Sequence, residues 1–221
     1  IQYHVWATEE FGVDGWRVDT YKYNEEKFLN DMNNALTREF PKLSVFGESW
    51  VTSPVANAYF TRNNLKTPFA HNAEGMLDFQ TCFAMIASAK EENGWSNGLI
   101  KLYFSLAQDA LYQDPMKNCI FLDNHDMDRI YTQLGNDLAL TKMAMTCLMT
   151  LRGIPQVYYG TEVLLDNSQH PGDHGYIRAD MPGGWNTDNV NAFEAKSLNE
   201  DQVNMQAYMK KLLNWRKGSK A

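Results

Sequence analysis

The sequence predicts an α/β fold in which short parallel strands alternate with helices. Short runs of apolar, β-branched and aromatic residues recur along the 221 residues, and each is followed by a segment with helical periodicity. Strands that alternate with helices pair in parallel, because each helix carries the chain back to the start of the next strand. Three of the runs end in acidic residues, so we expect these side chains at the carboxyl ends of the strands, where such folds hold their active sites.

The first part of the chain contains a helix, a strand and a second helix. Residues 1–11 are predicted to be a helix that ends at Gly12, which suits a left-handed cap. A strand over 15–18 follows, and the next helix is predicted over 25–40 with Asn24 as its N-cap. Apolar residues recur every four positions in this helix, namely Phe28, Met32, Leu36 and Phe40.

The rest of the chain continues the alternation with less regular spacing. The predicted strands are 43–47, 75–77, 119–122 and 156–159. Helices are predicted over 79–89 and 95–111, and apolar stripes within 140–151 and 205–213 mark two more. The segment 53–67 is expected to be irregular with short helical turns, and 160–185 to be a long loop. A closed (β/α)8 barrel has eight strand–helix units, whereas this chain has about five. The pattern of elements is therefore compatible with either an open sheet or part of a barrel.

The composition argues against several classes of partner. The net charge of -7 and the isoelectric point near 5.2 disfavour nucleic acid and anionic membranes, because both attract basic surfaces. A neutral substrate fits this charge better. The three cysteines lie in apolar contexts without metal-site spacing, so we expect buried thiols and no disulfides. No window resembles a signal peptide or a membrane span.

The first acidic motif is Gly-Trp-Arg-Val-Asp at 15–19. Arg17 and Asp19 are two residues apart on a strand, so their side chains point to the same side of the sheet. A neighbouring guanidinium keeps a carboxylate ionised and oriented, as a nucleophile requires. An ordinary buried ion pair is the alternative interpretation.

The second motif is Phe-Gly-Glu-Ser-Trp at 46–50, which ends a predicted strand with Glu48. Apolar neighbours raise the pKa of a carboxyl group, which a general acid that works near neutral pH needs. Taken alone, a glutamate at a strand end is more often a solvated residue at the rim of the sheet.

The third motif is Asp-Asn-His-Asp-Met-Asp-Arg at 123–129, directly after an apolar strand. Its density of polar side chains at a strand end favours a functional site. A metal site built from histidine and aspartate is the alternative, but the spacing matches no calcium loop.

The three motifs, in their order and at these intervals, resemble sequence blocks of the α-amylase superfamily, the retaining (β/α)8 enzymes that act on α-glucans. Residues 122–129 and the tail Gly-Ile-Pro-Gln-Val-Tyr-Tyr-Gly-Thr-Glu at 153–162 are most similar to neopullulanases and cyclomaltodextrinases. The resemblance implies a partial (β/α)8 TIM barrel, covering about strands 4–8 with their helices. Residues 1–221 would then form one partial catalytic domain, with the N-terminal barrel strands and the C-terminal β-sandwich absent.

The resemblance also implies roles for the residues at matching positions. Asp19 would be the nucleophile, Glu48 the general acid/base, and Asp126 the carboxylate that binds sugar hydroxyls and stabilises the transition state. Arg17 would orient Asp19, and His125 would hydrogen-bond the sugar at the cleavage point. This double displacement retains the anomeric configuration and needs the nucleophile and acid/base carboxyl groups about 5–5.5 Å apart.

Three aromatic residues are candidates for contacts with sugar rings. These are Tyr21, Trp50 and Trp185, although packing at the base of a loop explains Trp50 equally well. The loop over 160–185 follows the last strand and is expected to overhang the pocket. The family's first sequence block, which often supplies calcium ligands, is absent, so neither a metal nor a cofactor is expected.

The sequence therefore predicts a retaining hydrolase of starch-type α-glucans. The alternatives are a non-catalytic glucan-binding or assembly subunit and, from another class, a metal-dependent α/β hydrolase. A partial barrel would expose strand edges, which predicts a homo-oligomer that covers them and an isolated region that lacks full activity. The compartment is not predicted. Three histidines outside the motifs are expected to have no catalytic role: His71, His170 and His174.

Overall fold

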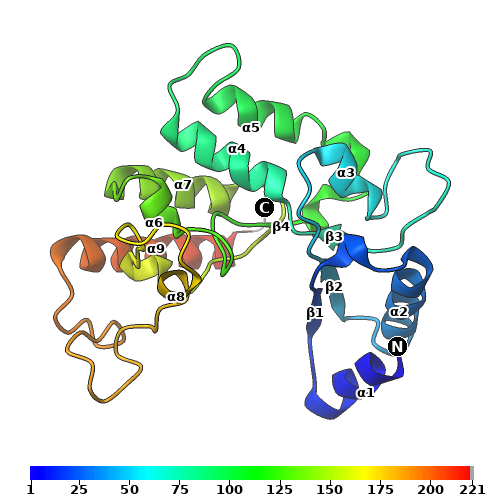
Figure 1. Cartoon of the computed structure of the whole chain (residues 1–221), viewed down its shortest axis with the longest axis horizontal. Helices are drawn as coiled ribbons and strands as arrows, with labels where there is room; N and C mark the ends of the chain where they lie inside the picture. The colour runs from blue at the N-terminus through cyan, green and yellow to red at the C-terminus, as the bar shows by residue number, and fades with distance from the viewer. Residues whose placement is uncertain (220–221) are drawn as a thin grey trace. The chain divides into compact units, whose positions relative to one another are not determined.

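The computed structural model describes residues 1–219, which form two compact units. The first unit contains residues 1–81, 103–120 and 152–154. The second contains residues 82–102, 121–151 and the chain from residue 155 onward. Figure 1 shows both units and labels the α-helices and the strands β1 to β4.

The strands are short and follow one another in chain order. They are β1 (Gly15–Val18), β2 (Ser44–Gly47), β3 (Gly75–Met76), β4 (Cys119–Ile120) and β5 (Ile154–Pro155). β1 pairs with β2 and β2 with β3, both in parallel, with Arg17 opposite Phe46. β4 pairs with β5, and a parallel bridge between Leu77 and Cys119 connects the two sheets. The predicted parallel α/β fold is confirmed.

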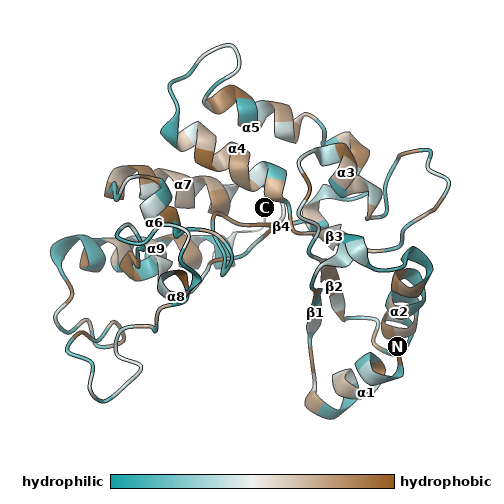
Figure 2. Ribbon diagram, in the orientation of Figure 1, coloured by the Kyte–Doolittle hydropathy of each residue, from teal (hydrophilic) through white to brown (hydrophobic). Residues whose placement is uncertain are grey.

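Helices connect these strands. The longer ones are α1 (Gln2–Phe11), α2 (Glu26–Glu39), α4 (Phe79–Lys90), α5 (Leu99–Leu106), α7 (Leu138–Thr150) and α9 (Glu200–Gly218). The short ones are α3 (Pro54–Tyr59), α6 (Ile130–Gln133), α8 (His174–Ile177), and the 3-10 turns η1 (Tyr21–Tyr23), η2 (Asp109–Leu111), η3 (Pro115–Lys117) and η4 (Thr161–Val163). Figure 2 shows apolar residues along much of α4 and α7.

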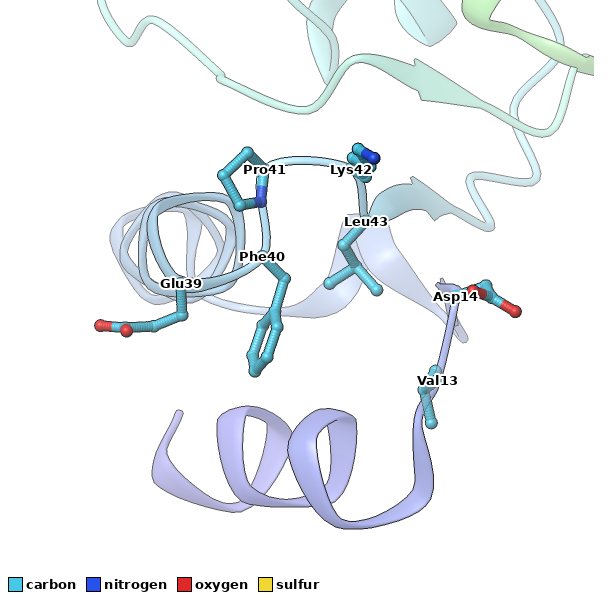
Figure 3. Close-up of a pocket in the computed structure, with 7 residues that line it drawn as sticks. All are labelled: Val13, Asp14, Glu39, Phe40, Pro41, Lys42 and Leu43. Carbon is cyan, nitrogen blue, oxygen red and sulfur yellow. The ribbon is translucent and has the colours of Figure 1, made fainter.

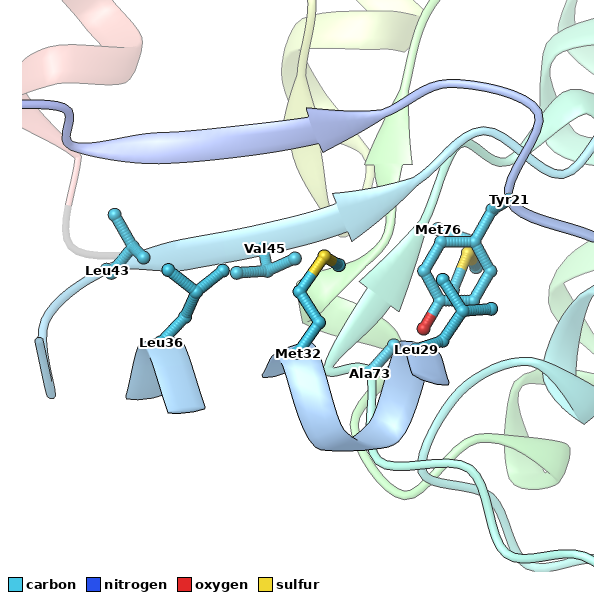
Figure 4. Close-up of a cluster of buried hydrophobic side chains, with 8 residues drawn as sticks. All are labelled: Tyr21, Leu29, Met32, Leu36, Leu43, Val45, Ala73 and Met76. Carbon is cyan, nitrogen blue, oxygen red and sulfur yellow. The ribbon is translucent and has the colours of Figure 1, made fainter. Parts of the chain in front are cut away.

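The core of the first unit lies between α2 and the sheet (Figure 4). One face of α2 buries Leu29, Met32 and Leu36 against Val45 of β2 and Met76 of β3. The buried stripe thus includes Leu29, whereas Phe28, which the sequence placed on that stripe, is 40% exposed. The reason is that a helix repeats every 3.6 residues, so a strict spacing of four drifts off the core face.

The ends of the first two helices test the predicted caps. Gly12 ends α1 with φ 61°, as predicted, and its backbone N–H donates to the carbonyl of Thr8. The cap of α2 is Glu25 rather than Asn24, because the Glu25 carboxylate accepts from the backbone N–H of Lys27 and Phe28. The amide of Asn24 instead donates to the carbonyl of Thr20, in the turn after β1.

Two predicted elements differ most from the observed ones. The helix predicted over 95–111 covers only Leu99–Leu106, because Gly98 before it has a φ of 68°. The last strand pairs at Ile154 and Pro155 rather than over 156–159. Just beyond it, the carbonyl of Tyr159 accepts a hydrogen bond from a side chain, that of Arg129, instead of from a strand.

A buried ionic network connects distant segments of the first unit. Arg152, just before β5, donates to Asp109 at 2.6 and 2.9 Å and to Asp78 at 2.8 Å. Asp78, after β3, also accepts from the backbone N–H of Thr81 at 3.0 Å and so holds the first turn of α4. Burial opposes a charge on Arg152, but hydrogen bonds and the charges of Asp109 and Asp78 raise its pKa above the ordinary value.

The second unit is built around α7 and α9. Leu148 of α7 is buried, as are Met205 and Met209 on α9. Arg216 of α9 donates to the carbonyl of Met149 at 2.6 Å. Across residues 1–219, no helix combines the length and the apolar character needed to cross a membrane.

Candidate active site

A pocket of about 410 Å³ lies beyond the carboxyl ends of β1 and β2. It is lined by residues from the turns after these two strands, namely Thr20, Lys22, Tyr23, Glu48 and Trp50. The first two acidic motifs therefore meet at one edge of the sheet, as parallel pairing of their strands requires.

One guanidinium joins the two carboxylates of these motifs. Arg17 Nη1 lies 3.1 Å from Asp19 Oδ1, and Arg17 Nη2 donates to Glu48 Oε1. The side chain of Glu48 is 8% exposed, whereas that of Asp19 is 65% exposed. The sequence paired Arg17 with Asp19 alone, and the structure adds Glu48. Two carboxylates held by one planar cation are kept close together and oriented.

The backbone after Asp19 is held in an uncommon conformation. Thr20 has φ 48° and ψ 36°, in the left-handed region that β-branched residues rarely occupy. Hydrogen bonds to the neighbouring strand fix this turn, because Tyr21 N donates to the Glu48 carbonyl at 2.9 Å and Glu48 N to the Val18 carbonyl at 2.8 Å. Strain of this kind persists only where the surrounding structure enforces it, and it clusters at functional sites.

A buried polar network begins at Ser49, the residue that follows Glu48. The hydroxyl of Ser49 donates to Asn57 Oδ1 at 2.7 Å, and Asn57 Nδ2 donates to the Tyr112 hydroxyl at 3.3 Å. Ser49 and Asn57 are fully buried. Burial raises the pKa of Tyr112, so its hydroxyl stays protonated. The sequence analysis did not identify Asn57. Its importance depends on the burial of its amide, which no local sequence pattern shows.

The backbone before Glu48 has no room for a side chain. A Cβ atom at Gly47 would lie 2.5 Å from the ring of Tyr21 and 2.6 Å from the sulfur of Met76. Glycine at this position lets both side chains close the core directly beneath Glu48.

Two of the three aromatic candidates follow β1 and β2 in the chain, and the structure places one in the core and the other at the pocket. The assignment of Tyr21 as a sugar platform is wrong, because its side chain is fully buried in the core and its hydroxyl bonds to Asn33. Trp50 is 39% exposed and lines the pocket, while its ring stacks on Phe79 at 4.4 Å between centroids. The Trp50 ring is thus packed against Phe79 and also partly exposed to the pocket. Its contact with sugar stays a prediction.

The third motif is placed in the second unit. His125 Nε2 lies 3.1 Å from Asp126 Oδ2, and Arg178 Nη2 donates to Asp126 Oδ1 at 2.7 Å. His174 Nδ1 lies 3.7 Å from the same oxygen of Asp126. The structure thus brings His125 and Asp126 together, while the convergence of Asp126 on Asp19 and Glu48 stays a prediction.

Two residues of this cluster were missed by the sequence analysis. His174 was expected to have no catalytic role, and its position beside Asp126 was not predicted; Arg178 was not considered. A signal for Arg178 does exist, since it is the only lysine or arginine between residues 160 and 185. Trp185, at the end of that loop, is 64% exposed, and its indole N–H donates to Asp180 at 2.9 Å.

A buried carboxyl group precedes these residues. Asp123 Oδ2 accepts from the backbone N–H of Ile130 at 2.8 Å. Burial raises the pKa of Asp123 to about 6 from 3.8, and this hydrogen bond and the charge of Arg129 oppose the shift only in part.

The stability of the protein is therefore expected to fall as the pH rises from about 4 to about 6. The folded state holds a proton on Asp123 that the unfolded state has already lost, so this stabilisation is present below pH 3.8 and lost through pH 6. The difference corresponds to about 3 kcal/mol. Asp123→Asn should remove this pH dependence and stabilise the protein above pH 6, as measured by urea unfolding.

A matched control is Asp31→Asn, at an exposed carboxylate on α2. It should change the free energy of unfolding by less than about 1 kcal/mol throughout. Wild-type and Asp123→Asn proteins with parallel pH profiles would contradict the prediction.

A second pocket, of about 390 Å³, lies at the opposite ends of the same strands (Figure 3). Phe40 and Leu43 point into the space above α1, while Glu39 points away from it. Its lining contains none of Arg17, Asp19 and Glu48. Within residues 1–219, no group of three or more His, Cys, Asp or Glu side chains is arranged to hold a metal ion.

Several known proteins are similar to this chain in sequence. The cyclomaltodextrin glucanotransferase of Niallia circulans is 32% identical over 175 residues, which cover 78% of this chain and 22% of that protein. The maltogenic alpha-amylase of Bacillus acidopullulyticus is 28% identical over 191 residues, covering 82% and 28%. The chain thus spans less than a third of the length of these relatives.

Solved structures agree in fold. The alpha-amylase of Geobacillus thermoleovorans in complex with acarbose matches 99% of this chain and 43% of its own, with a TM-score of 0.77 and 23% identity. The model of the alpha amylase catalytic domain matches residues 2–220. Since this match includes all three acidic motifs and every strand that carries them, the chain belongs to the α-amylase catalytic-domain family.

Proposed function

We propose that this chain is part of a retaining glycoside hydrolase that acts on starch-type α-glucans. One observation carries the proposal: Arg17 contacts the carboxylates of both Asp19 and Glu48, and Glu48 lines a pocket. Two carboxyl groups at close range suit double displacement, whereas an inverting enzyme needs a wider gap for water.

In the proposed mechanism Asp19 attacks the anomeric carbon while Glu48 protonates the leaving oxygen. Glu48 then accepts a proton from the water that cleaves the glycosyl-enzyme. Asp126 and His125 bind the hydroxyls of the reacting sugar, and Trp50 and Trp185 contact neighbouring rings. We also propose that the protein forms a homo-oligomer, in which a second copy of the chain covers exposed strand edges.

Substrate preference follows the relatives named above. One is a maltogenic alpha-amylase and another a cyclomaltodextrin glucanotransferase, so we propose maltodextrins, including cyclic ones, as substrates, with neopullulanase- or cyclomaltodextrinase-like hydrolysis as the main reaction. A non-catalytic glucan-binding subunit is less well supported, because Asp19, Glu48 and Asp126 are all present.

Product analysis of the intact protein tests the proposal. Incubation with cyclodextrin, pullulan and starch should release α-anomeric products, which NMR can detect before mutarotation. Products of the β-anomer would exclude retention. Binding without cleavage would favour the glucan-binding subunit, and activity lost to a chelator would favour a metal-dependent hydrolase.

A further inference from the structure

A buried arginine ties the long loop after β5 to the third motif, within the second unit. Arg129 is 1% exposed, and its Nε donates to the carbonyl of Ile177 at 2.8 Å. Its Nη1 donates to the carbonyl of Tyr159. The guanidinium also lies over the rings of Tyr158 and Tyr159, at 4.1 and 4.8 Å from their centroids. The residue before this loop and a residue within it are therefore both fixed to one side chain.

The residue that follows this anchor reaches Asp126. Arg178 donates through Nη2 to Asp126 Oδ1 at 2.7 Å and through Nε to the carbonyl of His125 at 2.9 Å. The other carboxylate oxygen, Oδ2, lies 3.1 Å from His125 Nε2. Partners on both oxygens restrict the rotation of the Asp126 carboxylate.

We propose that Arg178 is a positioning residue that orients Asp126, and that Arg129 holds Arg178 in place. The inference rests on the proposed function, in which Asp126 binds the reacting sugar. A long side chain on a free loop would lose much conformational entropy on forming this contact. The Arg129 anchor at Ile177 lowers that cost, because the backbone next to Arg178 is already fixed and only the side chain has still to be ordered. His174 Nδ1, 2.8 Å from Arg178 Nη2, adds a further contact.

The test compares Arg178→Ala and Arg178→Lys in the intact protein. With cyclodextrin as substrate, Arg178→Ala should lower kcat by about 10- to 100-fold, because small errors in orientation are costly to catalysis. KM should change less than kcat. Arg178→Lys should lie between, since lysine keeps the charge but not the two-point geometry. Added guanidinium chloride at millimolar concentration should restore part of the kcat of Arg178→Ala.

A matched control is Arg38→Ala, at a side chain that is 79% exposed and pairs with Glu39 on α2. It should leave kcat unchanged, and all three variants should keep the wild-type unfolding midpoint, because exposed ion pairs contribute little to stability. A wild-type kcat in Arg178→Ala would overturn the inference.

Crystal structures of the wild type and of Arg178→Ala separate this inference from the proposed function. We expect the Asp126 carboxylate to rotate away from its wild-type orientation in the variant. An unchanged carboxylate would overturn the positioning role, whether or not the protein cleaves glucans. Absence of glucan cleavage by the wild type would instead contradict the proposed function alone.

Discussion

Asp19→Asn in the intact protein is expected to lower kcat for α-glucan cleavage by about 10⁴-fold or more, the scale on which loss of a covalent nucleophile acts. The amide has nearly the same shape and can still accept from Arg17, so the pocket should keep its structure. What it lacks is a carboxylate that can form the glycosyl ester. Steady-state hydrolysis of cyclodextrin measures the effect.

Two further variants sharpen this prediction. Asp14→Asn changes an exposed aspartate before the other end of β1 and should leave kcat unchanged. Asp19→Ala with added azide should regain partial cleavage, because the small anion can attack from the face that the carboxylate has vacated. The glycosyl azide should then have the β configuration. Hydrolysis by Asp19→Asn at the wild-type rate would remove Asp19 from its proposed role.

Arg152→Met is expected to lower the free energy of unfolding by about 3–5 kcal/mol at pH 7, as removal of one partner from a buried ion pair does. The variant would leave Asp78, whose side chain is 2% exposed, and the half-buried Asp109 without their cation. Asp78 also holds the first turn of α4, so its loss of orientation should spread to that helix. Urea unfolding of the intact protein measures the change.

The prediction has an internal check. Adding Asp78→Asn and Asp109→Asn to Arg152→Met should recover much of the lost stability, because no uncompensated charge then remains buried. Arg38→Met, at an exposed ion pair, should cost less than about 1 kcal/mol. A stability of Arg152→Met within about 1 kcal/mol of wild type would show that the network contributes little.

The fold could be predicted from local patterns where each pattern has one structural solution. Apolar runs followed by helical periodicity predicted the order of β1 to β4, and Gly12 predicted its left-handed cap. The last strand was misplaced because the apolar run at 154–159 is longer than its paired segment, and its length does not show where pairing stops. Past β5, the carbonyl of Tyr159 accepts from the side chain of Arg129, which comes from a distant part of the chain.

In the candidate site, too, local patterns predicted some residues, whereas others depend on the surrounding structure. Arg17, Asp19 and Glu48 could be predicted to meet because the strand period and parallel pairing fix where strand-end residues lie. Tyr21 was misassigned because an aromatic residue after a strand looks the same in sequence whether it faces the pocket or the core. Asn57 contacts Tyr112 and Arg178 contacts Asp126, both far away in sequence, and no local pattern encodes such contacts.

The shared guanidinium has a consequence for the order of charges during turnover. In the proposed mechanism Asp19 becomes a neutral ester once the sugar is attached, so Arg17 loses one of its two anionic neighbours. Glu48, having given up its proton to the departing chain, is then the sole counter-ion of Arg17. One side chain thus contacts both groups whose charges change during the proposed cycle, which couples its two halves through Arg17.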